Sequence, residues 1–226
     1  LSEIMERENK DMIVNMLYVR SSLERANESR REMEAVNVKL LKQSETDQMT
    51  GLANRYRLNA YSEKVLDYCY EHRLPLAMEI LDIDFFKQYN DNYGHQQGDE
   101  CIIAIADELK KMEDGQTFCA RYGGDEFIII YAGISVEEVH AKAGALRQNI
   151  MNLKLEHLYS KALPIVTISQ GISYGVPEEG NRSWDFLHTA DMLLYQVKKR
   201  SRNDICIADI RGQELDLSSK QEKVEP

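Results

Sequence analysis

The chain has 226 residues, 43% of them hydrophobic, which is enough to bury an ordinary core in one domain with an appendage or in two small domains. Its formal net charge of −10 provides no overall basic footprint, so we expect no nucleic-acid partner. No apolar run reaches the roughly 18 residues of a membrane span, and no signal peptide is visible. We therefore expect a cytoplasmic domain, and a membrane anchor upstream of Leu1 in the full-length protein stays open. The four scattered cysteines form no CxxC pair and predict buried, reduced thiols.

Residues 1–46 contain neither glycine nor proline and are rich in charged and long apolar side chains. One heptad position is apolar throughout and holds Met5, Met12, Val19, Ala26, Met33 and Leu40. A repeat of seven residues is typical of a coiled coil. The companion seam is interrupted, because it contains Met16 and Leu23 but also Asn9, Arg30 and Asn37. We therefore expect a long N-terminal signalling helix that forms a parallel homodimer and follows an upstream sensor domain missing from this chain. A single amphipathic helix packed on the domain is the alternative.

From Asp47 onward, helical and strand patterns alternate along the chain. Apolar residues at helical spacing predict helices over 54–73, 97–113, 135–150 and 187–197. Compact apolar or β-rich runs predict strands over 75–84, 165–174 and 204–210. Ser135 and Glu138 are spaced as a capping box at the start of the third helix. This interleaving favours an α+β fold with a central, mainly antiparallel sheet and flanking helices, followed by a polar C-terminal tail over 213–226.

The stretch "ARYGGDEFIII" places two glycines and two carboxylates inside an apolar strand pattern. Gly123 and Gly124 fit a two-residue hairpin turn, because glycine adopts positive φ freely. A plain hairpin with solvated Asp125 and Glu126 is the simplest interpretation. Alternatively, the missing side chains let a phosphate approach the backbone, and the two carboxylates hold a hard divalent cation.

A second acidic pair, Asp82 and Asp84, ends the strand predicted over 75–84. Buried carboxylates need a partner, because an unpaired buried charge is costly. If this strand lies beside the hairpin, Asp82 converges with Asp125 and Glu126. Clustered carboxylates, a divalent cation and a glycine gap for phosphates together favour nucleotidyl transfer. The spacing alone does not choose among polymerase-like, cyclase-like and kinase-like chemistry.

Five segments carry a family resemblance, namely "DQMTGLANR" (47–55), "LDIDFFKQYNDNYGHQQGDE" (81–100), "RYGGDEF" (121–127), "VTISQGIS" (166–173) and "ADMLLYQVKKRSRN" (190–203). In order and spacing they resemble the GGDEF family of diguanylate cyclases. The resemblance implies a domain over 47–212 with a fold like the nucleotidyl cyclase or polymerase palm, which has a ferredoxin-like core. It also implies that two GTP molecules are joined into cyclic di-GMP with release of two pyrophosphates, across a homodimer and with Mg²⁺ or Mn²⁺.

The resemblance implies roles for individual residues by matching position. Catalysis is carried over to Asp125 and Glu126, and metal ligation to Asp82, the Ile83 carbonyl, Asp125 and Glu126. Phosphate contacts are carried over to Phe85, Phe86, Lys87, Gly123, Gly124, Lys198 and Arg202. Guanine contacts are carried over to Asn90 and Asp99, and a local cap is the alternative for Asn90. For Arg121, a ligand contact and a structural salt bridge both stay open.

One departure from the family pattern bears on control. Many members carry Arg-x-x-Asp ahead of the glycines, where it forms an inhibitory site for the product. This sequence has Asp114 and Thr117 at those positions and lacks the arginine fork, so we expect weak product inhibition. Our interpretation is an active diguanylate cyclase. The alternatives are a catalytically inactive GTP or cyclic di-GMP sensor on the same fold, and an interaction module whose working part is the N-terminal helix.

Overall fold

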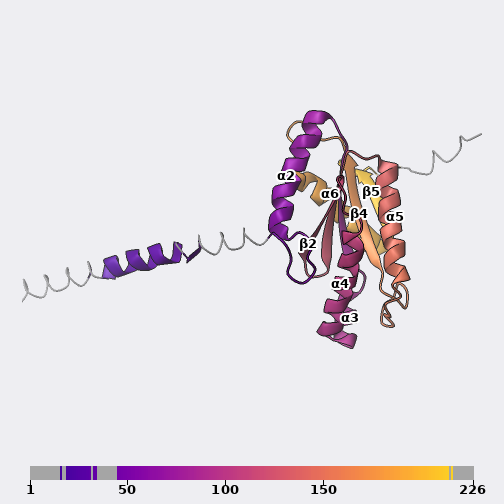
Figure 1. Ribbon diagram of the computed structural model, residues 1–226, viewed down its shortest axis with the longest axis horizontal. Coiled ribbons are helices and arrows are strands. Elements are labelled where there is room, and N and C mark those ends of the chain that lie inside the picture. The colour runs from indigo at the N-terminus through magenta and orange to yellow at the C-terminus, as the bar shows by residue number, and fades with distance from the viewer. Residues whose placement is uncertain (1–15, 17–18, 32, 35–44, 214, 216–226) are drawn as a thin grey trace, which may run out of the picture. The chain divides into compact units, whose positions relative to one another are not determined.

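The computed structural model describes residues 16, 19–31, 33–34, 45–213 and 215 of the chain (Figure 1). They belong to two compact units, Leu1–Glu45 and Thr46–Pro226. In the first unit, residues 19–31 are helical, and four large apolar seam residues are exposed: Met16, Val19, Leu23 and Met33. The seam residues Met5, Asn9, Met12, Asn37 and Leu40 lie outside the described residues. The coiled coil therefore stays a prediction.

The second unit is organised around a five-stranded sheet in the order β2-β3-β1-β4-β5. Its strands are β1 (Leu76–Ile83), β2 (Thr117–Gly123), β3 (Glu126–Ala132), β4 (Ile168–Gly175) and β5 (Ile205–Asp209). β1 lies in the centre and pairs antiparallel with β3 and β4, β2 pairs antiparallel with β3, and only the edge pair β4–β5 is parallel. The predicted α+β fold with a mainly antiparallel, palm-like sheet is confirmed.

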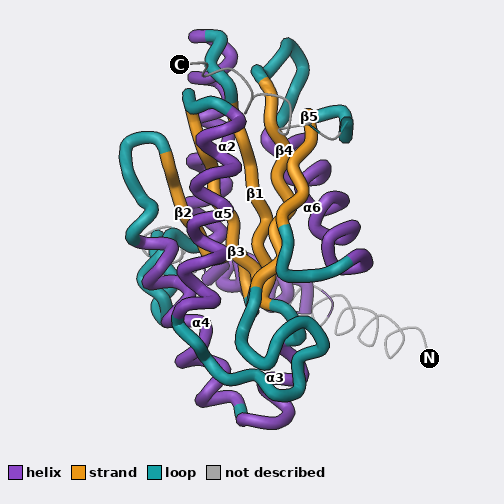
Figure 2. The backbone as a smooth tube through the Cα atoms, turned by 90° about the vertical axis from the view of Figure 1, so that its right-hand side faces the viewer, coloured by secondary structure: helices purple, strands orange, loops and turns teal. Residues whose placement is uncertain are grey.

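Helices cover both faces of the sheet, and an apolar cluster lies between the sheet and the helices on each face. They are α2 (Arg55–His72), α3 (Phe86–Tyr93), α4 (His95–Lys110), α5 (Val136–Asn152) and α6 (Ser183–Arg200). One cluster joins α3, α4 and α5 to sheet residues such as Leu81 and Phe127, and the other joins α2 and α6 to Met78 and Ile130. Alternate residues of β1 thus enter opposite clusters, as the period of a strand requires. Figure 2 shows α3 beyond one end of the strands, which is the end at which β1 finishes.

The hairpin between β2 and β3 differs by one residue from the prediction. Gly123 pairs with Glu126, so the two turn residues are Gly124 and Asp125, and the prediction of a turn at Gly123-Gly124 is wrong. The register shifts between Arg121 and Gly123, because Tyr122 is an extra residue on β2 with no partner on β3. Gly124 has φ +56°, a left-handed conformation that glycine adopts without a steric penalty.

Two other local features predicted from the sequence, a helix cap and the state of the cysteines, agree with the structure. The Ser135 side chain accepts from the Glu138 amide at 3.2 Å, and the Glu138 carboxylate accepts from the Ser135 amide at 2.9 Å, so the capping box is confirmed. All four cysteines lie in the described part of the chain and are buried thiols, as predicted. Among the residues that the structure describes, none of the helices combines the length and apolar character of a membrane span.

Candidate active site

The end of β1 and the start of β3 bring two carboxylates together. Asp82 and Glu126 are directly opposite each other in the β1–β3 register, and Asp125 lies in the adjoining turn. Asp82 is 7% exposed, and its Oδ2 atom lies 2.6 Å from the Nζ atom of Lys198, which comes from the last turn of α6. Four residues from three different segments thus form one acidic centre with a single ammonium group against it.

The acidic centre holds more negative charge than its lysine compensates. Burial raises the pKa of Asp82 to about 6; contacts with Lys198 oppose this shift, and the charges of Asp125 and Glu126 add to it. Burial also raises the pKa of Glu126, Lys198 lowers it, and Asp125 and Asp191 raise it further. Asp82 and Glu126 therefore resist ionisation, first because they are buried and further because negative charges lie nearby, and additional positive charge would relieve that repulsion.

These residues fit a hard divalent cation in their chemistry. Carboxylate and backbone carbonyl oxygens are its preferred ligands, and Asp82, Asp125, Glu126 and the Ile83 carbonyl are of that kind. As the side chains stand, no three His, Cys, Asp or Glu side chains of the described residues are grouped to enclose a metal ion. Instead, the ammonium group of Lys198 contacts Asp82 and supplies the positive charge there.

The other aspartate of the pair points into the fold. Asp84 is fully buried and accepts hydrogen bonds from the hydroxyls of Thr167 and Ser169, at 2.7 and 2.6 Å. Its carboxylate also accepts from the amide of Asn203 at 2.9 Å and lies 3.6 Å from the guanidinium of Arg202. Asp84 therefore ties the ends of β1, β4 and α6 together and is saturated by protein partners.

Phe85 is the N-cap residue of α3 and has a left-handed conformation, with φ +57°. The side chain of Phe85 makes no capping hydrogen bond, and backbone amides in the first turn of a helix are suited to an anion. The guanidinium of Arg202 lies 4.2 Å from the centre of the Phe85 ring. Phe86 is buried in the core, so its backbone amide is what it can offer to a ligand, whereas the side chain of Lys87 is exposed.

The two candidate guanine contacts lie on neighbouring helices. Asn90 of α3 packs on Gly98 of α4 so closely that a Cβ atom at Gly98 would lie 1.8 Å from the Asn90 Oδ1 atom. This buried oxygen has no hydrogen-bond partner among the described residues, and Asp99, next to Gly98, is exposed. A buried acceptor without a partner is unusual in a native protein.

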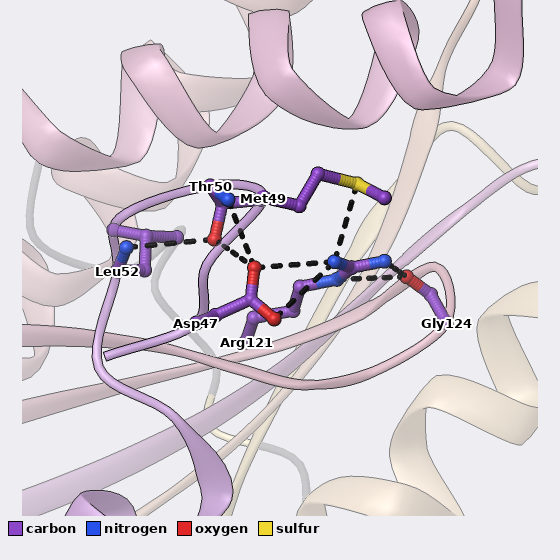
Figure 3. A network of polar contacts seen from close by, with 6 residues as sticks. All are labelled: Asp47, Met49, Thr50, Leu52, Arg121 and Gly124. Atoms are coloured by element: carbon purple, nitrogen blue, oxygen red, sulfur yellow. Dashed lines mark hydrogen bonds and ion pairs between the residues drawn. The ribbon is translucent and has the colours of Figure 1, made fainter. Parts of the chain in front are cut away.

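A second polar network fixes the hairpin turn (Figure 3). Arg121 of β2 donates to the Gly124 carbonyl at 2.8 and 3.1 Å and to the Asp47 carboxylate at 3.2 Å. Thr50 donates its amide and hydroxyl to the same carboxylate. Burial opposes ionisation of Asp47, but the hydrogen bonds from Thr50 and Arg121 lower its pKa overall. Arg121 forms a structural salt bridge, the second of the alternatives left open by the sequence.

Comparison with known proteins connects this geometry to a family. Residues 44–204 match the family described as "Diguanylate cyclase, GGDEF domain". The chain belongs to this GGDEF family. The GGDEF domain is 34% identical over 163 residues to the probable diguanylate cyclase DgcC of Escherichia coli, covering 71% of this chain and 42% of the relative. It is 33% identical over 190 residues to the diguanylate cyclase DgcP of Pseudomonas aeruginosa, covering 82% and 28%. The chain thus spans less than half the length of these relatives.

A solved structure resembles the GGDEF domain as well. The coiled coil and GGDEF domain of DgcB from Caulobacter crescentus, in complex with c-di-GMP, superimposes with a TM-score of 0.67 at 28% identity, covering 81% of this chain and 97% of that one. The diguanylate cyclase SiaD in complex with its activator SiaC, from Pseudomonas aeruginosa, gives a TM-score of 0.65 at 26% identity, covering 91% and 76%.

Two adjoining cavities of the GGDEF domain meet at Glu126 and Asp191. One, of about 220 Å³, lies between α6 and the sheet and has Trp184 and Tyr122 in its wall; the other, of about 290 Å³, reaches Lys198. No role was predicted for Asp191 from the sequence. Its spacing of seven residues from Lys198 places both on one face of a helix, and that periodicity is the signal that could have identified it.

At the start of β2, Asp114 and Thr117 are held by a protein partner. The carboxylate of Asp114 lies 2.9 Å from the ammonium group of Lys142 on α5, and that ammonium also donates to the Thr117 hydroxyl at 3.2 Å. The hydrogen bond from Lys142 and those of Gln116 and Thr117 lower the pKa of Asp114 to about 2, against a smaller effect of burial. Weak product inhibition stays a prediction.

Proposed function

We propose that the GGDEF domain condenses two GTP molecules into cyclic di-GMP with release of two pyrophosphates, and that two copies of the chain act together. The observation that carries this proposal is the acidic centre of Asp82, Asp125, Glu126 and Lys198 beside an open glycine turn. A catalytically inactive sensor of GTP or cyclic di-GMP on the same fold is the alternative. The presence of every carboxylate and of the lysine favours the enzyme.

Asp82, the Ile83 carbonyl, Asp125 and Glu126 would hold a divalent cation, Mg²⁺ or Mn²⁺. When bound, this cation lowers the pKa of the attacking hydroxyl and neutralises charge on the leaving pyrophosphate. Asp125 lies in the turn and is the residue that we assign to accept the proton of the ribose 3′-hydroxyl. The 3′-oxygen then bonds to the α-phosphorus of the other GTP, and the bond from that phosphorus to the bridging oxygen of pyrophosphate breaks.

The phosphates would lie between the start of α3 and the glycine turn. Backbone amides of Phe85 and Phe86 and the side chain of Lys87 offer donors on one side. On the other side, a Cβ atom placed on Gly123 or Gly124 would meet no atom of the described residues within 4 Å, so there is open space for a phosphate. Lys198 and Arg202 supply positive charge from the end of α6 and the loop after it.

The guanine base would contact Asn90 and Asp99. The unpaired Asn90 oxygen and the exposed Asp99 carboxylate are acceptors for the N1–H and N2–H₂ donors of guanine, a donor pair that adenine lacks. A site that hydrogen-bonds a base edge discriminates against an analogue that leaves its buried polar groups unpaired. This arrangement supports GTP rather than ATP as the substrate.

A second copy of the chain would complete the reaction. Each cyclic product contains two equivalent linkages. The 3′-hydroxyl of each GTP therefore attacks the α-phosphate of the GTP bound by the other protomer. We propose that residues 1–46 pair the protomers through the heptad seams, whose exposed apolar side chains at Val19 and Leu23 would be buried in a dimer. We place the domain in the cytoplasm, with its input from a sensor domain in another part of the protein.

Nucleotide preference tests the proposal. The purified chain should form product from GTP and not from ATP, and Asp99→Ala should reduce the GTP-to-ATP ratio of kcat/KM by about tenfold or more, because it removes base-edge hydrogen bonds. Asp107→Ala, on the exposed side of the same helix, is the matched control. Equal use of both nucleotides by the unmodified chain would contradict the assignment of Asn90 and Asp99, and tight binding of GTP without turnover would favour the sensor.

A further inference from the structure

A buried histidine lies directly behind the start of α3. His157, in the segment between α5 and β4, is fully buried, and its Nε2 atom lies 3.1 Å from the carbonyl oxygen of Phe85. The ring of Tyr89 packs edge-to-face against the imidazole, with 5.2 Å between the two ring centroids. The amide of His157 is held by the Pro164 carbonyl at 3.0 Å, so the backbone that carries the ring is itself fixed.

The contacts of His157 determine which nitrogen carries the proton. A carbonyl oxygen only accepts, so Nε2 must donate to Phe85. The Nδ1 atom is buried and has no partner in the described part of the chain. Burial also lowers the pKa of His157, although the Phe85 carbonyl and the charge of Asp84 oppose that shift. The contact with Phe85 therefore places a proton on Nε2, which acts as a hydrogen-bond donor, and burial favours the neutral form of the imidazole.

Phe85 needs such support because its conformation is unfavourable for a residue with a side chain. Left-handed φ values persist outside glycine only where the surroundings hold them. The ring of Phe85 is covered by the Arg202 guanidinium, and the preceding amide, that of Asp84, donates to the Thr167 carbonyl at 2.9 Å. The Phe85 carbonyl accepts from the Tyr89 amide within α3 at 3.0 Å and also from His157, so His157 adds support from outside the helix to the peptide that leads into its first turn.

We propose that His157 is a positioning residue for triphosphate binding, which fixes the Phe85 peptide so that the first-turn amides of α3 point at the phosphates. This inference rests on the proposed function, and it assigns a role to a histidine that touches neither the substrate nor the acidic centre. It predicts that loss of the hydrogen-bond donor weakens recognition of the triphosphate and leaves recognition of the base intact.

Three variants separate the donor from the ring. His157→Phe keeps a ring and removes the donor, His157→Gln restores a donor near the Nε2 position, and His140→Gln changes an exposed histidine on α5 as the control. We expect calorimetry to show about tenfold weaker binding of a non-hydrolysable GTP analogue by His157→Phe and unchanged binding of guanosine. His157→Gln should recover most of the affinity. In turnover assays, KM for GTP should rise more than kcat falls.

The outcomes distinguish the inference from the proposed function. Wild-type affinity for the analogue in His157→Phe would overturn the inference and leave the proposed function intact. A wild-type chain that binds no GTP analogue would overturn both. If His157→Phe does not fold, nitrogen-15 NMR of the wild type decides. The inference requires a proton on Nε2 whose exchange with water slows several-fold when the analogue binds, and a proton on Nδ1 or an unchanged exchange rate would overturn it.

Discussion

Asp82 and Glu126 face each other across two strands, and Lys198 compensates only part of their charge. Replacing either by its amide, as Asp82→Asn or Glu126→Gln, removes one negative charge and relieves the repulsion, so the fold should keep its thermal midpoint. Turnover should fall roughly a hundredfold or more. The variant lacks one carboxylate ligand for the cation, and the cation's stabilisation of charge in the transition state is weakened.

Initial rates of cyclic di-GMP formation and thermal melts check this prediction, with Asp67→Asn on the exposed side of α2 as the control. Near-wild-type rates from either amide variant would refute the assignment of these carboxylates.

Glu79 is a buried carboxylate that the proposed mechanism does not use. Its Oε2 atom accepts from the Tyr131 hydroxyl at 2.8 Å, its Oε1 atom has no partner among the described residues, and burial raises its pKa from 4.5 to about 8. A raised pKa means that the folded state keeps the proton while the unfolded state releases it. The contribution to stability is therefore complete below pH 4.5 and decreases as the pH rises to about 8.

Glu79→Gln abolishes this titration. Its free energy of unfolding relative to wild type should increase between pH 5 and 8, by at most about 1.4 kcal/mol per pH unit, and then level off. Urea unfolding across that range measures it, with Glu71→Gln as an exposed control. A pH-independent difference would show that Glu79 is ionised in the folded protein.

Some site residues could be read from the sequence and others could not. Asp82, Asp125 and Glu126 are acidic residues within strand patterns, where burial alone makes them conspicuous. The inward direction of Asp84 depends on Thr167 and Ser169, which approach only through pairing of β1 with β4. His157 is 72 residues from Phe85, so no local pattern could connect them.

At the scale of elements, the β2–β3 hairpin combines an open turn with a rigid support. Arg121 holds the Gly124 carbonyl, and nothing in the described residues occupies the space where a Gly124 side chain would lie. Gly124→Ala should therefore cost only the strain of a left-handed alanine, about 1 kcal/mol, while its methyl group intrudes on a bound phosphate. We expect kcat/KM for GTP to fall by about tenfold or more.

Gly180→Ala is a matched control, because that glycine also has positive φ and open space around it but lies in the loop between β4 and α6. Both variants should lose similar stability, and only Gly124→Ala should lose activity. Equal activities would refute the role of the glycine turn in phosphate binding.

The elements themselves were largely predictable, and their arrangement less so. Apolar periodicity located α2, α4, α5, α6 and the strand runs, because each element has one buried face. The shift of the hairpin turn by one residue arose from the irregularity after Arg121, which depends on pairing with β3. The parallel direction of β5 beside β4 follows from the crossover through α6, which local periodicity does not encode.

At the scale of the whole molecule, activity should depend on bringing two domains together. Removing residues 1–45 leaves a chain that starts at Thr46, the first residue of the second compact unit. This chain should fold and bind GTP, but its specific activity should be low in dilute solution and rise with protein concentration more steeply than that of the full chain. The reason is that a tether raises the effective concentration of the second protomer. Identical dilution curves for both chains would refute the N-terminal helix as the dimerisation element.

The most direct test of the account is the stoichiometry of the reaction. The purified full chain is incubated with GTP and Mg²⁺, and pyrophosphate, cyclic di-GMP and residual GTP are quantified together over time. We expect two pyrophosphates for each cyclic di-GMP and no loss of GTP by other routes. Bound GTP that is never consumed, or consumption to GDP and phosphate without a cyclic product, would contradict it.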